Sequence, residues 1–141
     1  SFIEEIQAKS GHEILRKSYD VAQMMKVVGE EGTSLADYID YLKGEFFDFV
    51  YLQQNAFDAV DEATPEERQK YTFNFIYQNI LEQKLELENK DKALHFFQAL
   101  RQLFKGWNSS LWQAEEFKGI EKEIIISLKE KIKSESETID V

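Results

Sequence analysis

The sequence predicts an all-α protein, and three observations lead to that prediction. Apolar residues recur at steps of three, four and seven along almost the whole chain, which is the period of an amphipathic helix. The 141 residues include one proline and six glycines, where average usage would give about seven and ten. The one β-like triplet, at residues 124–126, has helical pattern on both sides. We therefore expect about five helices in an antiparallel, bundle-like domain with short connections.

The first expected helix covers residues 12–28. Ser10 and Glu13 have the spacing of a capping box before it, in which each side chain satisfies a backbone N–H of the first turn. Apolar residues at 14, 21, 25 and 28 give this helix one buried face. Gly29 follows directly and is the residue type that most often ends a helix.

The second expected helix spans residues 35–53. Ser34, with Asp37 three positions later, is suited to cap its start. Gly44 lies inside this helix, where glycine costs about 1 kcal/mol relative to alanine. Close packing of a neighbouring element would explain its presence.

The third expected helix begins at Thr64, which is followed by Pro65 at the first turn and by Glu67 in the capping-box position. It follows a stretch, residues 54–63, that loses the helical period and is expected to be a structured connection. The helix is expected to end near residues 88–89.

Two more helices are expected in the last third of the chain. The fourth spans residues 91–105 and is ended by Gly106. The fifth starts at Ser110, with Gln113 completing its cap, and runs to Ile132. Residues 133–141 are polar and are expected to fray. Residues 1–141 together are expected to form a single helical domain.

Composition excludes several classes of function. The net charge of −10 disfavours nucleic acid as a partner, because phosphate binding needs clustered Lys and Arg. The absence of cysteine excludes disulfides, thiolate metal sites and cysteine nucleophiles. No apolar run approaches the 18 or more residues of a membrane span, so we expect no direct membrane insertion. No secretory signal pattern is visible either.

The sequence contains no motif for free-standing catalysis or metal binding. His12 and His95 are far apart and lack the Glu-x-x-His context of a carboxylate-bridged metal bundle, so both are interpreted as structural. The carboxylate pairs at 45/48 and 115/116 are interpreted as solvated helix faces. None of the six glycines precedes a lysine, which excludes a phosphate-binding loop of the G-x-x-x-x-G-K-[ST] type. We expect no catalytic residue and no metal site in this chain.

Two local features remain. The first is the acidic, glycine-flanked loop at residues 29–34 between two long helices, which alone could be a plain solvated hairpin. The second is the run Leu-Gln-Gln-Asn-Ala-Phe-Asp-Ala-Val-Asp at residues 52–61, in which Phe57 follows a helix end. Alone, Phe57 could be a core residue that anchors a loop.

Taken in order, these features resemble the helical C-terminal domain of the catalytic A subunit of V-type (V/A-type) ATPases. The Leu-Gln-Gln-Asn-Ala-Phe-Asp-x-Val-Asp run carries the specific part of the resemblance, and the stretch Tyr-Asp-Val-Ala-Gln-Met-Met-Lys-Val-Val-Gly at residues 19–29 supports it. The resemblance covers residues 14–61, about a third of the chain. The first residue, Ser1, fits a domain cut from a longer subunit.

The resemblance implies two contacts for this chain. The aromatic side chain of the Asn-Ala-Phe motif helps to form the adenine pocket, which assigns Asn55, Ala56 and Phe57 to nucleotide binding. The loop between the first two helices faces the central rotor. The rotor-facing residues are then Glu30, Glu31, Gly32, Thr33 and Ser34.

The resemblance also implies the setting in which these contacts operate. The A subunit alternates with B subunits in a hexameric ring around a central rotor stalk. The ring hydrolyses or synthesises ATP with Mg²⁺ while H⁺ or Na⁺ crosses a membrane. The complex lies on the cytoplasmic face of that membrane. The catalytic machinery belongs to another domain, so this chain alone is expected to bind no cofactor and to be inactive. The alternative is a stand-alone helical module that binds a partner helix through an apolar groove.

Overall fold

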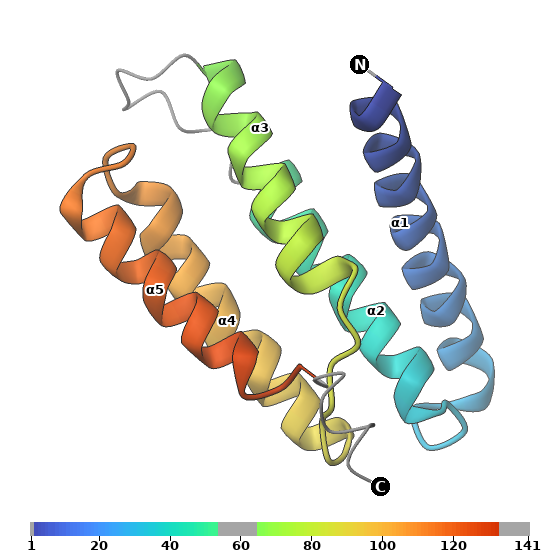
Figure 1. Cartoon of the computed structure of the whole chain (residues 1–141). Helices are drawn as coiled ribbons and strands as arrows, with labels where there is room; N and C mark the ends of the chain where they lie inside the picture. The colour runs from blue at the N-terminus through green and yellow to red at the C-terminus, as the bar shows by residue number, and fades with distance from the viewer. Residues whose placement is uncertain (1, 54–64, 133–141) are drawn as a thin grey trace, which may run out of the picture.

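The computed structural model of the chain describes residues 2–53 and 65–132, and this part is almost entirely helical (Figure 1). The helices are α1 (Phe2–Val28), α2 (Leu35–Phe47) continued by the π-helical η1 (Asp48–Gln53), α3 (Pro65–Ile76) continued by the π-helical η2 (Tyr77–Leu81), α4 (Lys90–Ser109) and α5 (Glu115–Lys129). The described residues form no strand beyond one isolated bridge between Leu85 and Ile132. The prediction of an all-α fold with five helices is confirmed.

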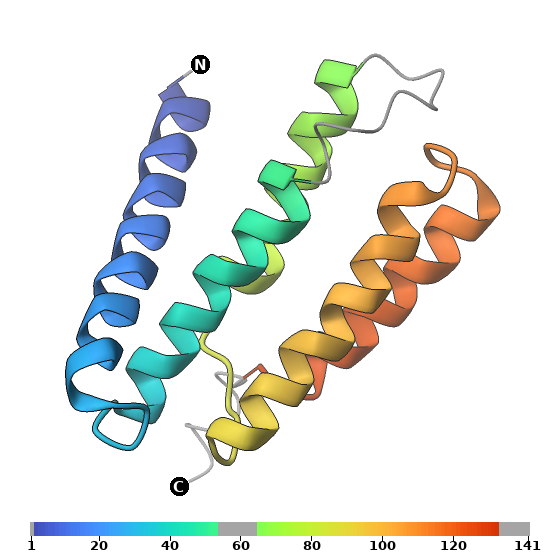
Figure 2. The same cartoon turned by 180° about the vertical axis from the view of Figure 1, so that it is seen from behind.

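The helices lie side by side with their axes roughly aligned. α1 and α2 form one antiparallel hairpin and α4 and α5 form another, while α3 lies over α2 between the two hairpins (Figures 1 and 2). The loop at 29–34 and the segment 82–89 share one end of the bundle, which we call the loop end. The end of η1, the start of α3 and the turn at 110–114 share the opposite end. We call it the connection end, because residues 54–64 join η1 to α3 there.

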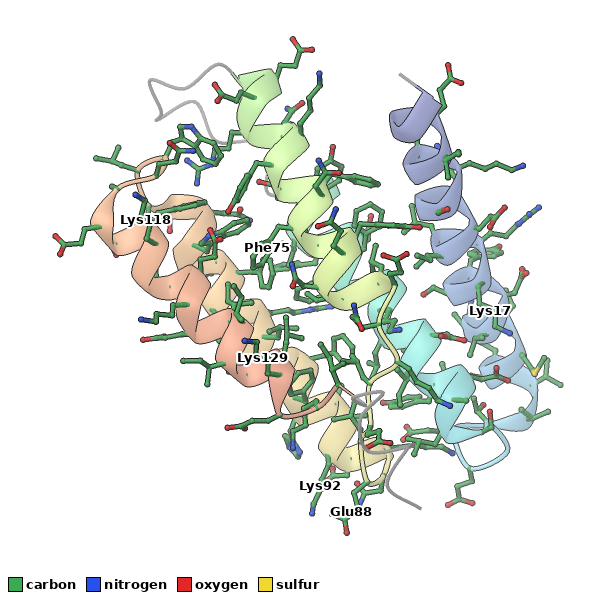
Figure 3. All side chains as sticks on the ribbon, in the orientation of Figure 1. Lys17, Phe75, Glu88, Lys92, Lys118 and Lys129 are labelled. Atoms are coloured by element: carbon green, nitrogen blue, oxygen red, sulfur yellow. The ribbon has the colours of Figure 1, made fainter. Side chains whose placement is uncertain are left out.

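Aromatic rings packed against one another form one part of the core between α2, α3, α4 and α5. Trp107 on α4 is fully buried, and its ring centroid lies 4.8 Å from Phe117 of α5 and 5.0 Å from Phe75 of α3. Phe75 points from α3 into this interior (Figure 3). Tilted, stacked and edge-on rings at these separations stabilise a core beyond the effect of area burial. Other side chains at the centre of the core are Phe46, Val50, Ile76, Ile80, Leu100, Phe104, Ile124 and Leu128.

α1 and α2 approach each other closely at one point. A Cβ atom added to Gly44 would lie 2.1 Å from Cβ of Ser18 and 2.4 Å from its hydroxyl oxygen. The Ser18 hydroxyl donates a hydrogen bond of 2.8 Å to the backbone oxygen of Tyr41. Gly44 therefore sits in the middle of a helix because the neighbouring helix leaves no room for a side chain, as its position in the sequence suggested.

A buried lysine ties α2 to the second half of the molecule. Lys43 is 8% exposed, and its ammonium group donates to the backbone oxygens of Gln83 at 2.6 Å and Leu81 at 3.5 Å. Burial lowers the pKa of Lys43 from its ordinary value, and the nearby carboxylate of Asp40 opposes this shift. The two carbonyls give this cation the hydrogen bonds that a buried charge requires.

Two predicted helix boundaries were wrong: the start of the first helix and the end of the third. α1 is already helical from Phe2, so Ser10 and Glu13 lie within it and do not cap it. The third helix ends with η2 at Leu81 and not near residues 88–89. Beyond it, Leu85 is buried and the amide of Glu86 donates to the carbonyl of Lys131 after α5. The chain therefore pairs with a distant segment here instead of continuing as a helix. The local sequence pattern gives no sign of this pairing.

Two boundaries around Gly106 also differ from the prediction. α4 continues through Gly106 to Ser109, because Trp107 and Asn108, which follow the glycine, are buried in the core and hold the last turn of the helix. Ser110 does not start the last helix, since its hydroxyl donates to the carbonyl of Trp107 at 2.7 Å and so closes α4. α5 begins at Glu115, after a turn in which Gln113 has φ 58°. Predicted tail residues 133–141 lie outside the described part of the chain.

Substituting Gly44 tests the close approach of α1 and α2. Gly44→Ala should destabilise the 141-residue chain by about 1–3 kcal/mol, because the new methyl group forces the helices apart. Gly119→Ala is the matched control, since Gly119 is also helical and nothing lies within 4 Å of an added Cβ. It should stabilise the chain by about 1 kcal/mol through helix propensity. Urea unfolding measures both, and equal shifts for the two variants would contradict the packing.

Candidate functional site

The loop at residues 29–34 is a tightly hydrogen-bonded turn. Gly29 ends α1 in the left-handed region with φ 79°, and the amide of Gly32 donates back to its carbonyl at 3.2 Å. The Thr33 hydroxyl donates to the same carbonyl at 3.0 Å. Ser34 caps α2 by accepting from the amide of Asp37 at 3.1 Å, as predicted. Two helices are thus joined by a short turn of defined shape.

The turn presents most of its predicted rotor-facing residues to the outside. Glu30, Glu31, Gly32 and Ser34 are exposed. Thr33 is different, because it is only 4% exposed and its side chain is used inside the turn. The ammonium group of Lys90, at the start of α4, donates to the backbone oxygen of Glu30. The structure therefore brings these residues together at the loop end, where Thr33 stabilises the turn and the others face outward.

An apolar patch lies beside this turn. Met24, Val27 and Val28, on the last two turns of α1, are 52%, 85% and 50% exposed. Their spacing of three and four places them on one face of the helix. Val28 was expected to belong to the buried stripe of the first helix, and the structure shows that it does not. Apolar side chains that gather on a surface in this way mark contact sites.

The sequence contains a signal for this exposed patch that the predicted single buried face did not take into account. Residues 24–28 read Met-Met-Lys-Val-Val, so apolar side chains occupy both sides of the helix there. A helix with one buried face needs only one apolar stripe. The surplus apolar residues indicate a second contact.

The predicted adenine-contacting residues Asn55, Ala56 and Phe57 lie outside the described residues. What the structure describes are the two elements on either side of them, η1 and α3. Both are attached to the C-terminal end of α4. The side-chain amide of Asn108 donates to the backbone oxygen of Val50 in η1 at 3.3 Å. The guanidinium group of Arg68 in α3 donates to the backbone oxygens of Asn108 at 2.8 Å and Trp107 at 3.2 Å.

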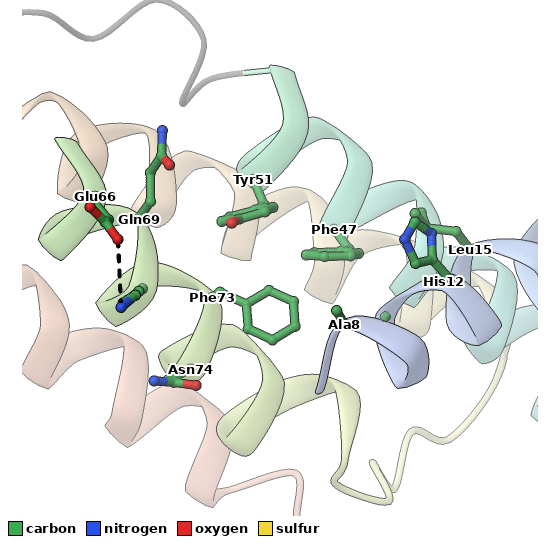
Figure 4. A pocket seen from close by; sticks show the side chains of 11 residues that line it. Ala8, His12, Leu15, Phe47, Tyr51, Glu66, Gln69, Phe73 and Asn74 are labelled. Atoms are coloured by element: carbon green, nitrogen blue, oxygen red, sulfur yellow. Dashed lines mark ion pairs between the residues drawn. The ribbon is translucent and has the colours of Figure 1, made fainter. Parts of the chain in front are cut away.

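A cavity of about 440 Å³ opens at the connection end between α1, η1 and α3 (Figure 4). Three aromatic rings form part of its walls: Phe47 and Tyr51 stack with centroids 5.3 Å apart, and Phe73 meets Phe47 edge-on at 5.8 Å. Glu66 and Lys70, paired at 3.7 Å, lie at its polar rim with the exposed His12. Because the carboxylate of Glu66 partners this lysine, the cavity offers no cluster of cations for a phosphate group.

Two further titratable side chains, His95 and Tyr71, each pair with a carboxylate on the protein surface or between helices. His95 pairs with Asp91 one turn earlier on α4, with 3.5 Å between Nδ1 and the carboxylate, and both side chains are largely exposed. The Tyr71 hydroxyl donates to Glu121 at 2.6 Å, and its pKa is raised mainly by burial and then by this hydrogen bond. Within residues 2–53 and 65–132, no three His, Asp or Glu side chains are grouped to hold a metal ion. In the same ranges, no helix has the length and apolar character needed to cross a bilayer.

Comparison with known proteins gives a consistent result. The family model described as the C-terminal domain of V and A type ATP synthase matches residues 7–104. This match includes the turn at 29–34, η1, residues 55–57 and α3. No solved structure gives a significant match to the chain.

Curated relatives agree with the family model. A V-type ATP synthase alpha chain of Treponema denticola is 47% identical over 84% of this chain, and alpha chain 1 of Treponema pallidum is 46% identical over 92% of it. An alpha chain of Borrelia turicatae is 46% identical over 76%. The matched regions cover 20%, 22% and 18% of these three relatives, so the chain spans about a fifth of their length.

The matches decide between the two interpretations that the sequence left open. They favour the ATPase domain over a stand-alone interaction module, because the family model covers most of the chain. The chain belongs to the family of C-terminal domains of V- and A-type ATP synthases.

Proposed function

We propose that this chain serves as the C-terminal part of the catalytic A subunit of a rotary ATPase, which couples ATP hydrolysis or synthesis to transport of H⁺ or Na⁺. The observation that carries this proposal is the family match over residues 7–104, which spans both predicted contact regions. The intact subunit would bind ATP or ADP with Mg²⁺, and its partners would be B subunits of a ring and a central rotor stalk. The complex would lie on the cytoplasmic face of a membrane.

The first contact in this proposal is between Phe57 and the adenine ring, with Ala56 and Asn55 beside it. A base stacked on an aromatic side chain contributes about 1–3 kcal/mol in nucleic-acid complexes, and it needs no base-specific hydrogen bond. Support comes from the described neighbours, because η1 and α3 are both hydrogen-bonded to the same end of α4.

The second contact is between the loop end and the rotor. It comprises the exposed residues Glu30, Glu31, Gly32 and Ser34, with Thr33 bracing the turn from inside. The turn carries only two charges, whereas the three apolar side chains of the patch beside it are all exposed. Shape and apolar contact therefore suit this surface better than charge attraction does.

A continuous helix links the two contacts. α2 has 13 residues and η1 adds 6, which gives roughly 28 Å at 1.5 Å per residue. Its start is capped by Ser34 in the turn, and its last residue, Gln53, precedes the adenine-contacting residues. A push at the loop end would tilt this helix and move residues 55–57 relative to the phosphates held by another domain, as in rigid-body switching.

Replacing Phe57 tests the adenine contact. In the intact complex, Phe57→Ala should weaken MgADP binding about 5- to 150-fold, which corresponds to the loss of one base stack. Phe57→Tyr is the control, because it keeps the ring and should bind nearly as tightly. Titration calorimetry measures both variants. Unchanged affinity in the alanine variant would remove Phe57 from the adenine pocket.

The loop end can be tested separately from the nucleotide. Val27→Asp places a charge in the middle of the apolar patch and should reduce torque or ATP-driven transport, because it disrupts an apolar contact with the rotor. Joint replacement of Glu30 and Glu31 by Ala should have a smaller effect on torque, and neither change should alter nucleotide affinity. Single-molecule rotation reports the torque. Normal torque in the Val27→Asp variant would argue against a rotor contact through the patch.

The chain by itself is proposed to be inactive, because its sequence contains no phosphate-binding loop of the G-x-x-x-x-G-K-[ST] type. ATP hydrolysis by the purified 141-residue chain at an ordinary enzymatic rate would contradict this division of labour.

A further inference from the structure

One helix reaches both ends of the bundle and touches both proposed contact regions. α4 has 20 residues, which gives about 30 Å of helix. At the loop end its first residue, Lys90, donates to the backbone oxygen of Glu30 in the turn. At the connection end its last turn accepts from Arg68 and donates, through Asn108, to η1. No part of the proposed function yet assigns a role to this helix.

Asn108 attaches the η1 side of the connection to α4. The residue is 5% exposed, and its amide nitrogen donates to the carbonyl of Val50, which is itself fully buried. Val50 lies within the last four residues of η1, where carbonyls at a helix end commonly lack an intrahelical donor. Loss of a buried hydrogen bond of this kind costs the desolvation penalty of the group left behind.

Arg68 attaches the α3 side to the same turn of α4. Its guanidinium group donates to the carbonyls of Trp107 and Asn108, at the C-terminal end of a helix where positive charge is favourable. The same group lies over the rings of Phe117 at 5.5 Å and Trp112 at 5.9 Å. Both hydrogen bonds come from Nη2, and the planar guanidinium adds the two ring contacts, which an ammonium group on a lysine would not reproduce in the same way.

α4 is in turn held firmly in the core. Phe97, Leu100 and Phe104 on α4 are at most 2% exposed. Phe46 of α2 meets Phe104 at 5.0 Å and Phe97 at 5.9 Å, both edge-on. A closely packed interior transmits displacement instead of absorbing it. The last turn of α4 therefore holds a fixed position in the core, and η1 and α3 are attached to it.

We propose that α4 is a second strut beside α2 and that Arg68 and Asn108 are positioning residues for nucleotide binding. They hold η1 and α3, the two elements that flank residues 54–64, at a fixed separation on the last turn of α4. This inference rests on the proposed function, because it assumes that Phe57 contacts the adenine ring. It extends that proposal by naming residues far from the motif that set the geometry of its neighbours.

A double-mutant cycle in the intact complex tests this role. MgADP affinity is measured for Arg68→Met and Asn108→Ala, each with Phe57 present and in the Phe57→Ala background. With Phe57 present, each change should weaken binding about three- to tenfold, as residues that act as one unit are coupled. In the Phe57→Ala background the same changes should have less than about a twofold effect, since the group they position is gone.

Three further variants and measurements keep the test independent of folding. Arg68→Lys retains the charge and N–H donors but loses the planar group that lies over Phe117 and Trp112, so its affinity should fall between those of the wild type and Arg68→Met. Arg16→Met, at an exposed position on α1, removes the same charge elsewhere and should bind normally. Thermal unfolding of each assembled complex identifies any variant that is not folded. If Arg68→Met is not folded, Arg68→Lys replaces it in the cycle.

The outcomes separate this inference from the proposed function. If Phe57→Ala weakens binding and the Arg68 and Asn108 variants do not, the strut is overturned and the adenine contact stands. If the Arg68 and Asn108 variants weaken binding and Phe57→Ala does not, Phe57 is the wrong contact residue, and both the adenine contact and the positioning role are overturned. Equal weakening in both backgrounds would overturn the positioning role, because the two residues would then act independently of Phe57.

Discussion

The close approach of α1 and α2 at Ser18 and Gly44 is the constraint on which the rest of this structure depends. With no side chain at Gly44, the two helices meet at backbone distance, and the hydroxyl of Ser18 bonds to the carbonyl of Tyr41 on α2. Two helices joined this tightly, by a turn held with its own hydrogen bonds, form one stiff hairpin. A stiff hairpin can transmit a displacement at the turn to its other end.

The hairpin is fastened to the second half of the molecule at points along its length. Near the loop end the ammonium group of Lys43 reaches the carbonyls of Leu81 and Gln83. In the middle Phe46 packs against α4, and at the connection end Asn108 bonds to Val50. These ties are hydrogen bonds to backbone and contacts between large rings, which have few alternative arrangements. The described part of the chain is therefore suited to move as one lever with α2 and α4 as parallel struts.

Sequence reasoning predicted the fold class well because the helical period is a local signal. The turn at 29–34, its Ser34 cap and the tight packing at Gly44 were also predicted, since each follows from a residue type at a special position. The boundaries at Ser10, Gly106 and Ser110, and the end of the third helix, were wrong. They depend on tertiary contacts, such as the pairing of Glu86 with Lys131, that no local pattern reveals.

The candidate site was predicted in part for the same reason. The turn could be named from its glycines and charges, whereas the role of residues 55–57 was taken from a motif and stays a prediction. The apolar patch, the aromatic cavity and the attachment of Arg68 and Asn108 to neighbouring helices needed the structure. Arg68 has no sequence feature that separates it from an ordinary surface arginine, because its carbonyl partners lie about 40 positions away in the chain.

The central claim is that the loop end and the connection end move together, and a distance between them tests it most directly. Spin labels can be attached at Glu31→Cys and Gln69→Cys, both at exposed positions, because this chain contributes no cysteine of its own. The distance distribution is then measured in the intact complex with MgADP and without nucleotide. The account predicts the same single distance in both states. A second distance that appears in only one state would show that the chain bends between its two ends, and would contradict the account.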